Sequence, residues 1–133
     1  MKKISIAAIV FFLFGLSNLF GQNMEKQEVI TSINLKSYYF QHLVGDVEVN
    51  DNGVLLINGV KIDLKNAEVG YQSSKEGDHF IYFVSNNKEK VFEAWNGKEL
   101  IFKTNNVLHL TRTKEQAVEL VVLFNLLKSF YAS

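Results

Sequence analysis

The chain has no cysteine, no proline and a single arginine among its 133 residues. Without cysteine it forms no disulfide, and it has no thiol for nucleophilic catalysis. Without proline it lacks one of the residues that shield the outer strands of a sheet, so such strands need charge or coverage instead. The lone Arg112 argues against phosphate recognition by an arginine cluster. Stability must come from packing, for which a hydrophobic content of 47% is sufficient.

Neither sign of charge dominates, since 14 basic residues face 14 acidic ones. Two of the lysines lie in residues 1–21, and removal of that segment leaves 12 basic against 14 acidic residues, a net charge near −2. A surface of that charge does not neutralise nucleic-acid phosphates. We therefore expect no nucleic-acid partner.

Sequence motifs of catalysis are also missing. The chain has no Gly-x-Ser-x-Gly nucleophile motif, no glycine-rich phosphate loop and no complete calcium loop. His42, His79 and His109 are far apart and lack the spacing of metal ligands. We expect no catalytic residue, no metal site and no cofactor, and we interpret the histidines as structural or surface residues.

The chain begins with the pattern of a secretory signal peptide. Lys2 and Lys3 form a basic start, residues 4–16 form an almost uninterrupted apolar run, and Gly21 supplies a small residue before Gln22. A basic segment, an apolar run of about 7–15 residues and a small-residue cleavage site define such signals. The sequence predicts cleavage after Gly21 and export to the periplasm or the extracellular space.

Two other roles for this segment are disfavoured. A retained membrane anchor needs about 20 apolar residues, and the clean run is shorter. A lipid anchor at the cleavage site needs a cysteine, which the chain lacks. We therefore expect no stable membrane anchor after cleavage.

Residues 22–133 have the length of one domain, and their clearest local pattern spans residues 46–64. Asn58-Gly59 suits a two-residue type I′ turn, and Asp51-Asn52-Gly53 suits a three-residue loop. Both turns predict the same register for a three-stranded meander. The register places these residues on one face: Val47, Val49, Leu55, Ile57, Val60, Ile62 and Leu64.

Further short strands are predicted over residues 67–71, 79–84, 91–95, 100–103 and 107–110. Residues 79–84 are apolar on both faces, which predicts a central strand covered on both sides. Residues 24–45 approximate helical spacing up to Gly45, although Tyr38-Tyr39-Phe40 favours a strand. For that segment we favour a helix.

Thr113 and Gln116 fit a capping box that begins a C-terminal helix over about residues 114–131. One apolar stripe along it consists of Ala117, Leu120, Phe124, Leu127 and Tyr131. Val118, Val122 and Leu126 form a second set on the opposite half, although a surface helix usually needs one stripe. Either other segments cover this second set, or it is a candidate surface for a protein partner or a second copy.

Together these elements predict an α+β fold that is mainly antiparallel β. A small curved sheet or partly open barrel of about six to seven strands would pack against the C-terminal helix. The passage from Val107–Leu110 into the capped helix at Thr113 resembles the pleckstrin-homology-like superfold. The resemblance implies a helix that plugs one end of a barrel. The basic phosphoinositide-binding cluster of some members is missing here, so the resemblance does not imply that activity.

Aromatic residues give the only hint of a ligand site. Tyr71, Tyr82 and Trp95, and also Tyr38 and Tyr39, combine apolar area with a polar group and are candidates to line a cleft or to fill the core. The sequence favours an exported, non-enzymatic binding or interaction module with a protein partner. The alternatives are a carrier of an apolar small ligand such as a lipid, and a small hydrolase or isomerase with an unrecognised site.

Overall fold

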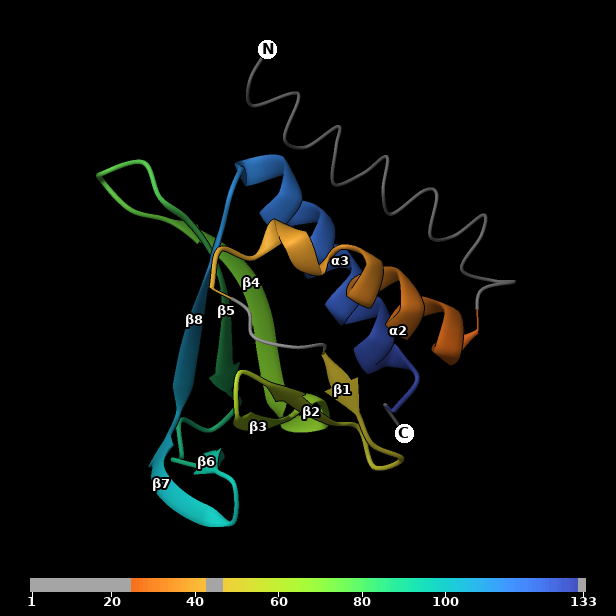
Figure 1. The fold of residues 1–133 in the computed structure, drawn as a ribbon, viewed down its shortest axis with the longest axis vertical. Helices are drawn as coiled ribbons and strands as arrows, with labels where there is room; N and C mark the ends of the chain where they lie inside the picture. The colour runs from red at the N-terminus through yellow and green to blue at the C-terminus, as the bar shows by residue number, and fades with distance from the viewer. Residues whose placement is uncertain (1–24, 43–46, 132–133) are drawn as a thin grey trace.

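The computed structural model describes residues 25–42 and 47–131 (Figure 1). All strand pairs are antiparallel, and a helix ends the described chain, so the predicted fold class is confirmed. The predicted signal peptide lies outside the described residues. The elements in order are α2 (Lys26–Leu35), the 3₁₀ turn η1 (Ser37–Tyr39), β1 (Glu48–Val49), β2 (Val54–Ile57), β3 (Val60–Asp63), the 3₁₀ turn η2 (Leu64–Asn66), β4 (Ala67–Ser73), β5 (His79–Ser85), β6 (Phe92–Asn96), β7 (Glu99–Thr104), β8 (Asn106–Thr111) and α3 (Lys114–Ser129).

The strands form two sheets that do not close into a barrel. Sheet A has the order β4-β5-β8, and sheet B has the order β1-β2-β3-β6-β7. Three passes of the chain bend from one sheet into the other, because β3 leads into β4, β5 into β6 and β7 into β8. In Figure 1, β2 and β3 run crosswise to β4 and β5, near the lower ends of these two strands. The described residues thus form eight antiparallel strands in two sheets, where the sequence predicted about six to seven in a curved sheet or partly open barrel.

Hydrogen bonds join the three connections between the sheets at the point where they lie side by side. Ser85, at the end of β5, is buried; its backbone N–H donates to the Asn105 carbonyl at 2.9 Å, and its hydroxyl donates to the Glu89 carbonyl at 2.8 Å. The N–H of Asn86 donates to the carbonyl of Asn66 at 2.9 Å. We call Asn66, Ser85, Asn86 and Asn105 the corner. Its bonds replace ladder bonds that the bend interrupts.

The meander predicted for residues 46–64 is confirmed in register. The Asn58–Gly59 turn has φ angles of 52° and 81°, as a type I′ turn requires, and it pairs Ile57 with Val60. The preceding loop pairs Val49 with Leu55, also as predicted. The apolar set that this register places on one face is buried or packs against the core.

One core joins both sheets to both helices. Phe83 of β5 and Phe124 of α3 are fully buried, and their rings meet edge to face with centroids 5.2 Å apart. Leu55 of β2 and Ile33 of α2 belong to the same buried cluster. The helix α3 thus covers the inner face of sheet A, and α2 packs on α3. Neither described helix is long and apolar enough to cross a membrane.

Side chains of α3 also shield the outer edge of β4. The amide of Asn125 donates to the carbonyl of Val69 at 3.3 Å, and the amine of Lys128 donates to the carbonyl of Ala67 at 2.7 Å. Such coverage keeps an edge strand from pairing with another chain.

The helix predicted over residues 24–45 is shorter than expected. It ends at Leu35, the turn η1 follows, and Phe40 adopts an extended backbone that bridges to Thr111 of β8. Of the residues that favour a strand by propensity, Tyr38 and Tyr39 lie in the 3₁₀ turn, and only Phe40 pairs with sheet A, through a single bridge. Gly45, the predicted end of the helix, lies outside the described residues.

The C-terminal helix begins where the sequence predicts, but its capping box is only half formed. The Thr113 hydroxyl accepts a hydrogen bond from the Gln116 N–H at 3.1 Å. The side-chain oxygen of Gln116 is buried without a hydrogen-bond partner, so it does not return the bond.

Replacement of Ser85 by alanine tests the corner. The Glu89 carbonyl would lose its hydrogen bond from the buried Ser85 hydroxyl, and we expect the free energy of unfolding to fall by about 1 kcal/mol. Urea denaturation measures the change. Ser73→Ala, at the exposed end of β4, is the control and should leave stability unchanged. An equal effect of both substitutions would show that the corner bond contributes nothing.

Candidate functional site

The face of sheet A turned away from α3 is apolar, yet it does not belong to the core. Tyr82 of β5 pairs with Leu108 of β8, and Phe80 pairs with Leu110. Leu108 is 48% exposed, and the others are half-buried. We call the following set the outer apolar face: Phe80, Tyr82, Val84, Leu108 and Leu110.

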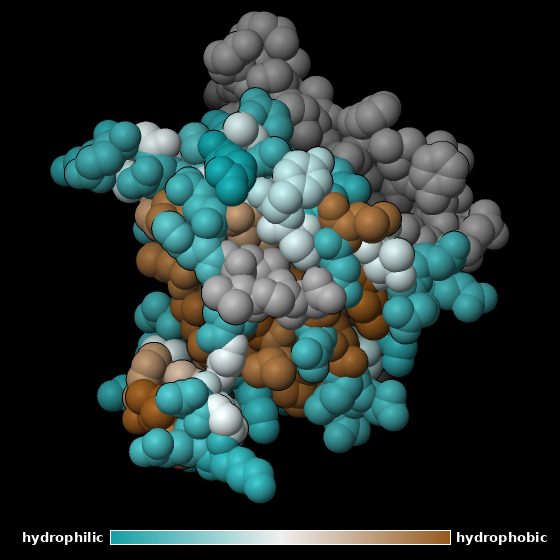
Figure 2. Space-filling view, viewed as in Figure 1, coloured by the Kyte–Doolittle hydropathy of each residue, from teal (hydrophilic) through white to brown (hydrophobic). Residues whose placement is uncertain are grey.

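Within residues 25–42 and 47–131 no element packs over this face, so the prediction that β5 is covered on both sides is corrected for the described residues. The inward residues Ile81 and Phe83 are fully buried beneath α3. The outward residues neither belong to the core nor pack against it. Figure 2 shows apolar side chains, drawn in brown, along β8 at the left margin of the molecule.

Two open hollows follow the outer apolar face. One, of about 400 Å³, is lined by Gln72, Tyr82, Val84, Asn106 and Leu108. The other, of about 260 Å³, is lined by Phe40, His42, Asn58, Phe80, Leu108, His109 and Leu110. Because Leu108 lines both, the hollows are neighbours on one surface.

The ring of Tyr82 occupies space that is free because the neighbouring strand has a glycine there. It pairs with Gly70 of β4, and a Cβ at position 70 would collide with the ring of Tyr82. The ring therefore lies across the backbone of β4. An aromatic ring packed over a strand glycine fills the space that a side chain would otherwise occupy.

His109 is among the residues that line the smaller hollow, but its ring lies on the inner side of sheet A, between two aromatic rings. Its ring meets Phe40 and Phe83 edge to face, with centroids 5.8 and 5.9 Å away. Its Nε2 atom is buried without a hydrogen-bond partner. Burial lowers the pKa of His109 to about 4, because the imidazolium form loses its hydration. His109 is thus a neutral core histidine at pH 7.

The other two histidines are separate from each other. His42 is exposed at the rim of the smaller hollow. His79 lies beside Tyr71, whose hydroxyl is 2.9 Å from its Nδ1 atom. Within residues 25–42 and 47–131, no three histidine or acidic side chains are grouped so as to hold a metal ion.

A partly buried polar contact lies between α3 and η1. The hydroxyl of Tyr39 donates to the carboxylate of Glu119 at 3.0 Å. Burial, and then this carboxylate, raise the pKa of Tyr39 above its ordinary value. Lys36 pairs with the same carboxylate at 3.5 Å, so the contact ties the end of α2 to α3.

The three aromatic residues predicted to line a cleft do not come together. Tyr71 faces inward on sheet A and Tyr82 faces outward on the same sheet. Trp95 lies on sheet B, where the amine of Lys61 is 4.9 Å from the centroid of its ring. Of the three, only Tyr82 belongs to the outer apolar face.

The second apolar set of the C-terminal helix is less exposed to solvent than the outer apolar face. Val118 is buried, with 6% of its surface exposed, and Val122 and Leu126 are half-buried. Leu126 packs against the edge of the core.

Sequence reasoning missed Phe80, Val84, Leu108 and Leu110 as site residues. A usable signal was present, because strands 79–84 and 107–110 carry apolar residues on both faces. A single helix covers only one face of a sheet. The apolar side chains of the second face therefore had to be exposed or covered by something else.

Comparisons with family models, with curated proteins and with solved structures found no match to this chain. The proposals below therefore depend on the geometry of the described residues.

A double-mutant cycle tests the contact between Gly70 and Tyr82. Gly70→Ala should destabilise the protein by about 1–3 kcal/mol, because the new methyl group overlaps the ring. In a Tyr82→Ala background most of that cost should disappear. Thermal or urea unfolding of the four proteins measures it. Equal costs in both backgrounds would contradict the contact.

Stability should depend on pH through His109. Its pKa is lowered in the folded state, so the unfolded chain binds the proton first as pH falls through about 6.5, and stability is lost toward the folded pKa. From pH 7 to pH 5 this loss is about 2 kcal/mol. His109→Leu should remove that part of the slope in urea denaturation, whereas His42→Gln should keep it. An unchanged slope in His109→Leu would contradict burial as the cause.

Proposed function

We propose that this chain is an exported binding module that takes an apolar segment of a protein partner on the outer apolar face of sheet A. One observation carries the proposal: five apolar side chains, in register across β5 and β8, lie outside the core, and Leu108 is 48% exposed. Contiguous apolar surface of this kind marks interaction sites in soluble proteins. Export is the expectation from the signal-peptide pattern at the start of the chain.

The composition of the surface supports a protein as the partner. Aromatic and aliphatic side chains lie at its centre, and Gln72, Asn106 and His42 lie around them. An apolar centre with an uncharged polar rim is typical of protein interfaces. The two hollows flank Leu108, so a partner could place one apolar side chain in each.

The alternative of a carrier for an apolar small molecule has less support. Ligand sites of that kind bury most of the ligand surface, whereas both hollows on the outer apolar face are open. Between sheet A and α3, where a carrier would hold its ligand, Phe83 and Phe124 are in contact.

Leu108→Lys is the decisive variant. A photo-crosslinking residue at position 108, placed in the full chain in its own host, first identifies the partner. Leu108→Lys should then weaken binding of the purified partner by about tenfold or more in calorimetry, because a charge would be buried among apolar contacts. Leu35→Lys, at an exposed position of α2, makes the same chemical change elsewhere and should bind as the wild type does.

Two outcomes would overturn the proposal. The first is equal partner affinity of Leu108→Lys and the wild type, with circular dichroism showing both folded. The second is extra mass from a lipid-like molecule in native mass spectrometry of the wild type from its own host, lost in Leu108→Lys. That second result would favour a carrier.

A further inference from the structure

Three asparagines of the chain are followed directly by glycine: Asn52-Gly53, Asn58-Gly59 and Asn96-Gly97. In such a pair the backbone nitrogen of the glycine can attack the side-chain amide carbon of the asparagine. Glycine favours this ring closure because it has no side chain to obstruct it and rotates freely. The reaction needs a free glycine N–H and a backbone that can turn into the attacking geometry. The fold therefore decides which of the three pairs is reactive.

The first pair, Asn52-Gly53, is held by the chain around it. The N–H of Gly53 donates to the Asn50 carbonyl at 3.1 Å, and its carbonyl accepts from the Leu64 N–H at 3.0 Å. Gly53 is buried beneath the ring of Tyr131, which a Cβ at this position would meet at 2.7 Å. The attacking nitrogen is thus engaged in a hydrogen bond, and its residue has no room to turn.

The second pair, Asn58-Gly59, is held by two other segments. The side-chain amide of Asn58 donates to the His42 carbonyl at 3.2 Å. The Gly59 carbonyl accepts from the Trp95 N–H at 2.8 Å, and a Cβ on Gly59 would lie 2.9 Å from the Trp95 carbonyl oxygen. Contacts from outside the turn therefore fix both reacting groups.

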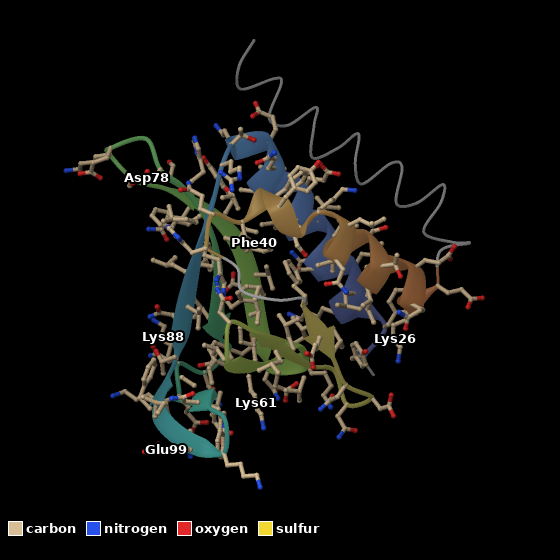
Figure 3. The ribbon with its side chains drawn as sticks, viewed as in Figure 1. Lys26, Phe40, Lys61, Asp78, Lys88 and Glu99 are labelled. Atoms are coloured by element: carbon tan, nitrogen blue, oxygen red, sulfur yellow. The ribbon has the colours of Figure 1, made fainter. Side chains whose placement is uncertain are left out.

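The third pair, Asn96-Gly97, lies at the turn between β6 and β7, and both of its residues are exposed. Within residues 25–42 and 47–131, neither the Asn96 side chain nor the Gly97 N–H has a hydrogen-bond partner. No atom lies within 4 Å of the place that a Cβ on Gly97 would occupy. Figure 3 shows Glu99, which follows this turn, at the lower end of the molecule and away from Lys26 of α2. Both reacting groups are thus free.

The hairpin that carries this turn is also the one best able to open. Among the described residues β7 pairs only with β6, and residues 99–103 are exposed except for contacts along that pair. Local opening at such an exposed end takes less free energy than global unfolding. The backbone at Asn96 therefore reaches the attacking geometry more often than the backbone at the two anchored pairs.

We propose that Asn96 is a site of spontaneous deamidation, and that the fold protects Asn52 and Asn58 from the same reaction. A base in the solvent removes the proton from the Gly97 nitrogen, which then bonds to the side-chain amide carbon of Asn96. The bond from that carbon to the amide nitrogen breaks, ammonia leaves, and a cyclic imide remains. Water opens the ring at either carbonyl and gives aspartate or isoaspartate. The net change exchanges ammonia for water, so it needs no oxidant and no cofactor.

The product would loosen the hairpin in which it forms. Asn96 pairs with Glu99, so a carboxylate at position 96 lies opposite another carboxylate. Like charges directly opposite each other destabilise a sheet. Isoaspartate also adds a carbon to the main chain and interrupts the ladder at the end of β6. This inference does not rest on the proposed function, because the outer apolar face lies on the other sheet.

Ageing of the full chain, purified from its own host and kept at mildly alkaline pH, tests the site. Peptide mapping by mass spectrometry measures the conversion at positions 52, 58 and 96. Position 96 should convert about tenfold faster than the other two, because its turn opens more easily. The rate should rise with pH, since the first step removes a proton.

The same protein unfolded in urea is the matched control. There the three pairs keep their sequences and lose their contacts, so their rates should become similar. Tyr131→Ala, folded, should speed conversion at Asn52 and leave the rate at Asn96 unchanged. Asn96→Gln should remove the fast conversion, because the larger ring that glutamine would form closes slowly.

Hydrogen exchange tests the consequence for the hairpin. Asn96→Asp places the charge of the product in the turn, and Asn96→Gln changes the side chain without adding a charge. The backbone amides of β7 should exchange faster in Asn96→Asp than in Asn96→Gln, by about threefold or more.

Three results would overturn the inference. One is conversion at Asn96 that is no faster than at Asn52 or Asn58 in the folded protein. Another is the same ratio of rates in urea as in the folded state, which would show that the fold protects neither of the other pairs. The third is equal exchange of the β7 amides in Asn96→Asp and Asn96→Gln, which would remove the effect on the hairpin.

Discussion

The bend at the corner is the constraint on which the rest of the structure depends. All three connections between sheet A and sheet B turn at the corner. The inner faces of both sheets therefore contribute to one core with α2 and α3. Turning a sheet this sharply interrupts its ladder, and buried backbone groups left unpaired are costly. Ser85 and Asn105 satisfy these groups locally. Backbone hydrogen bonds at the bend, together with the Ser85 hydroxyl, therefore satisfy the polar groups that the shared core would otherwise leave unpaired.

Parts of the fold with their own turn chemistry could be predicted from sequence. The Asn58–Gly59 turn fixes the register of its two strands, and Thr113 fixes the start of α3. The end of α2 could not be predicted, since it depends on Phe40 meeting Thr111, which is far away in the sequence. The second half of the capping box did not form, since the side-chain oxygen of Gln116 has no hydrogen-bond partner.

The candidate site was harder to predict than the fold. A strand that is apolar on both faces has the same sequence pattern whether one or both faces are covered. The pattern therefore placed Phe80 and Leu110 on a second apolar face, but whether that face is covered became clear only from the position of α3 on the inner face. Tyr82 was recognised as a candidate, but its companions Tyr71 and Trp95 lie on other surfaces. Sequence gives residue types, and only the three-dimensional arrangement decides which of them share a surface.

The hydrogen bonds from Asn125 and Lys128 to β4 show that α3 shields the edge of sheet A in addition to packing in the core. When the last turns of α3 fray, the carbonyls of Ala67 and Val69 lose their donors together with their cover. Local opening of a terminal helix takes less free energy than global unfolding. In this chain such an opening would uncover a seven-residue strand edge. Docking of α3 therefore keeps the edge of β4 from pairing with another chain.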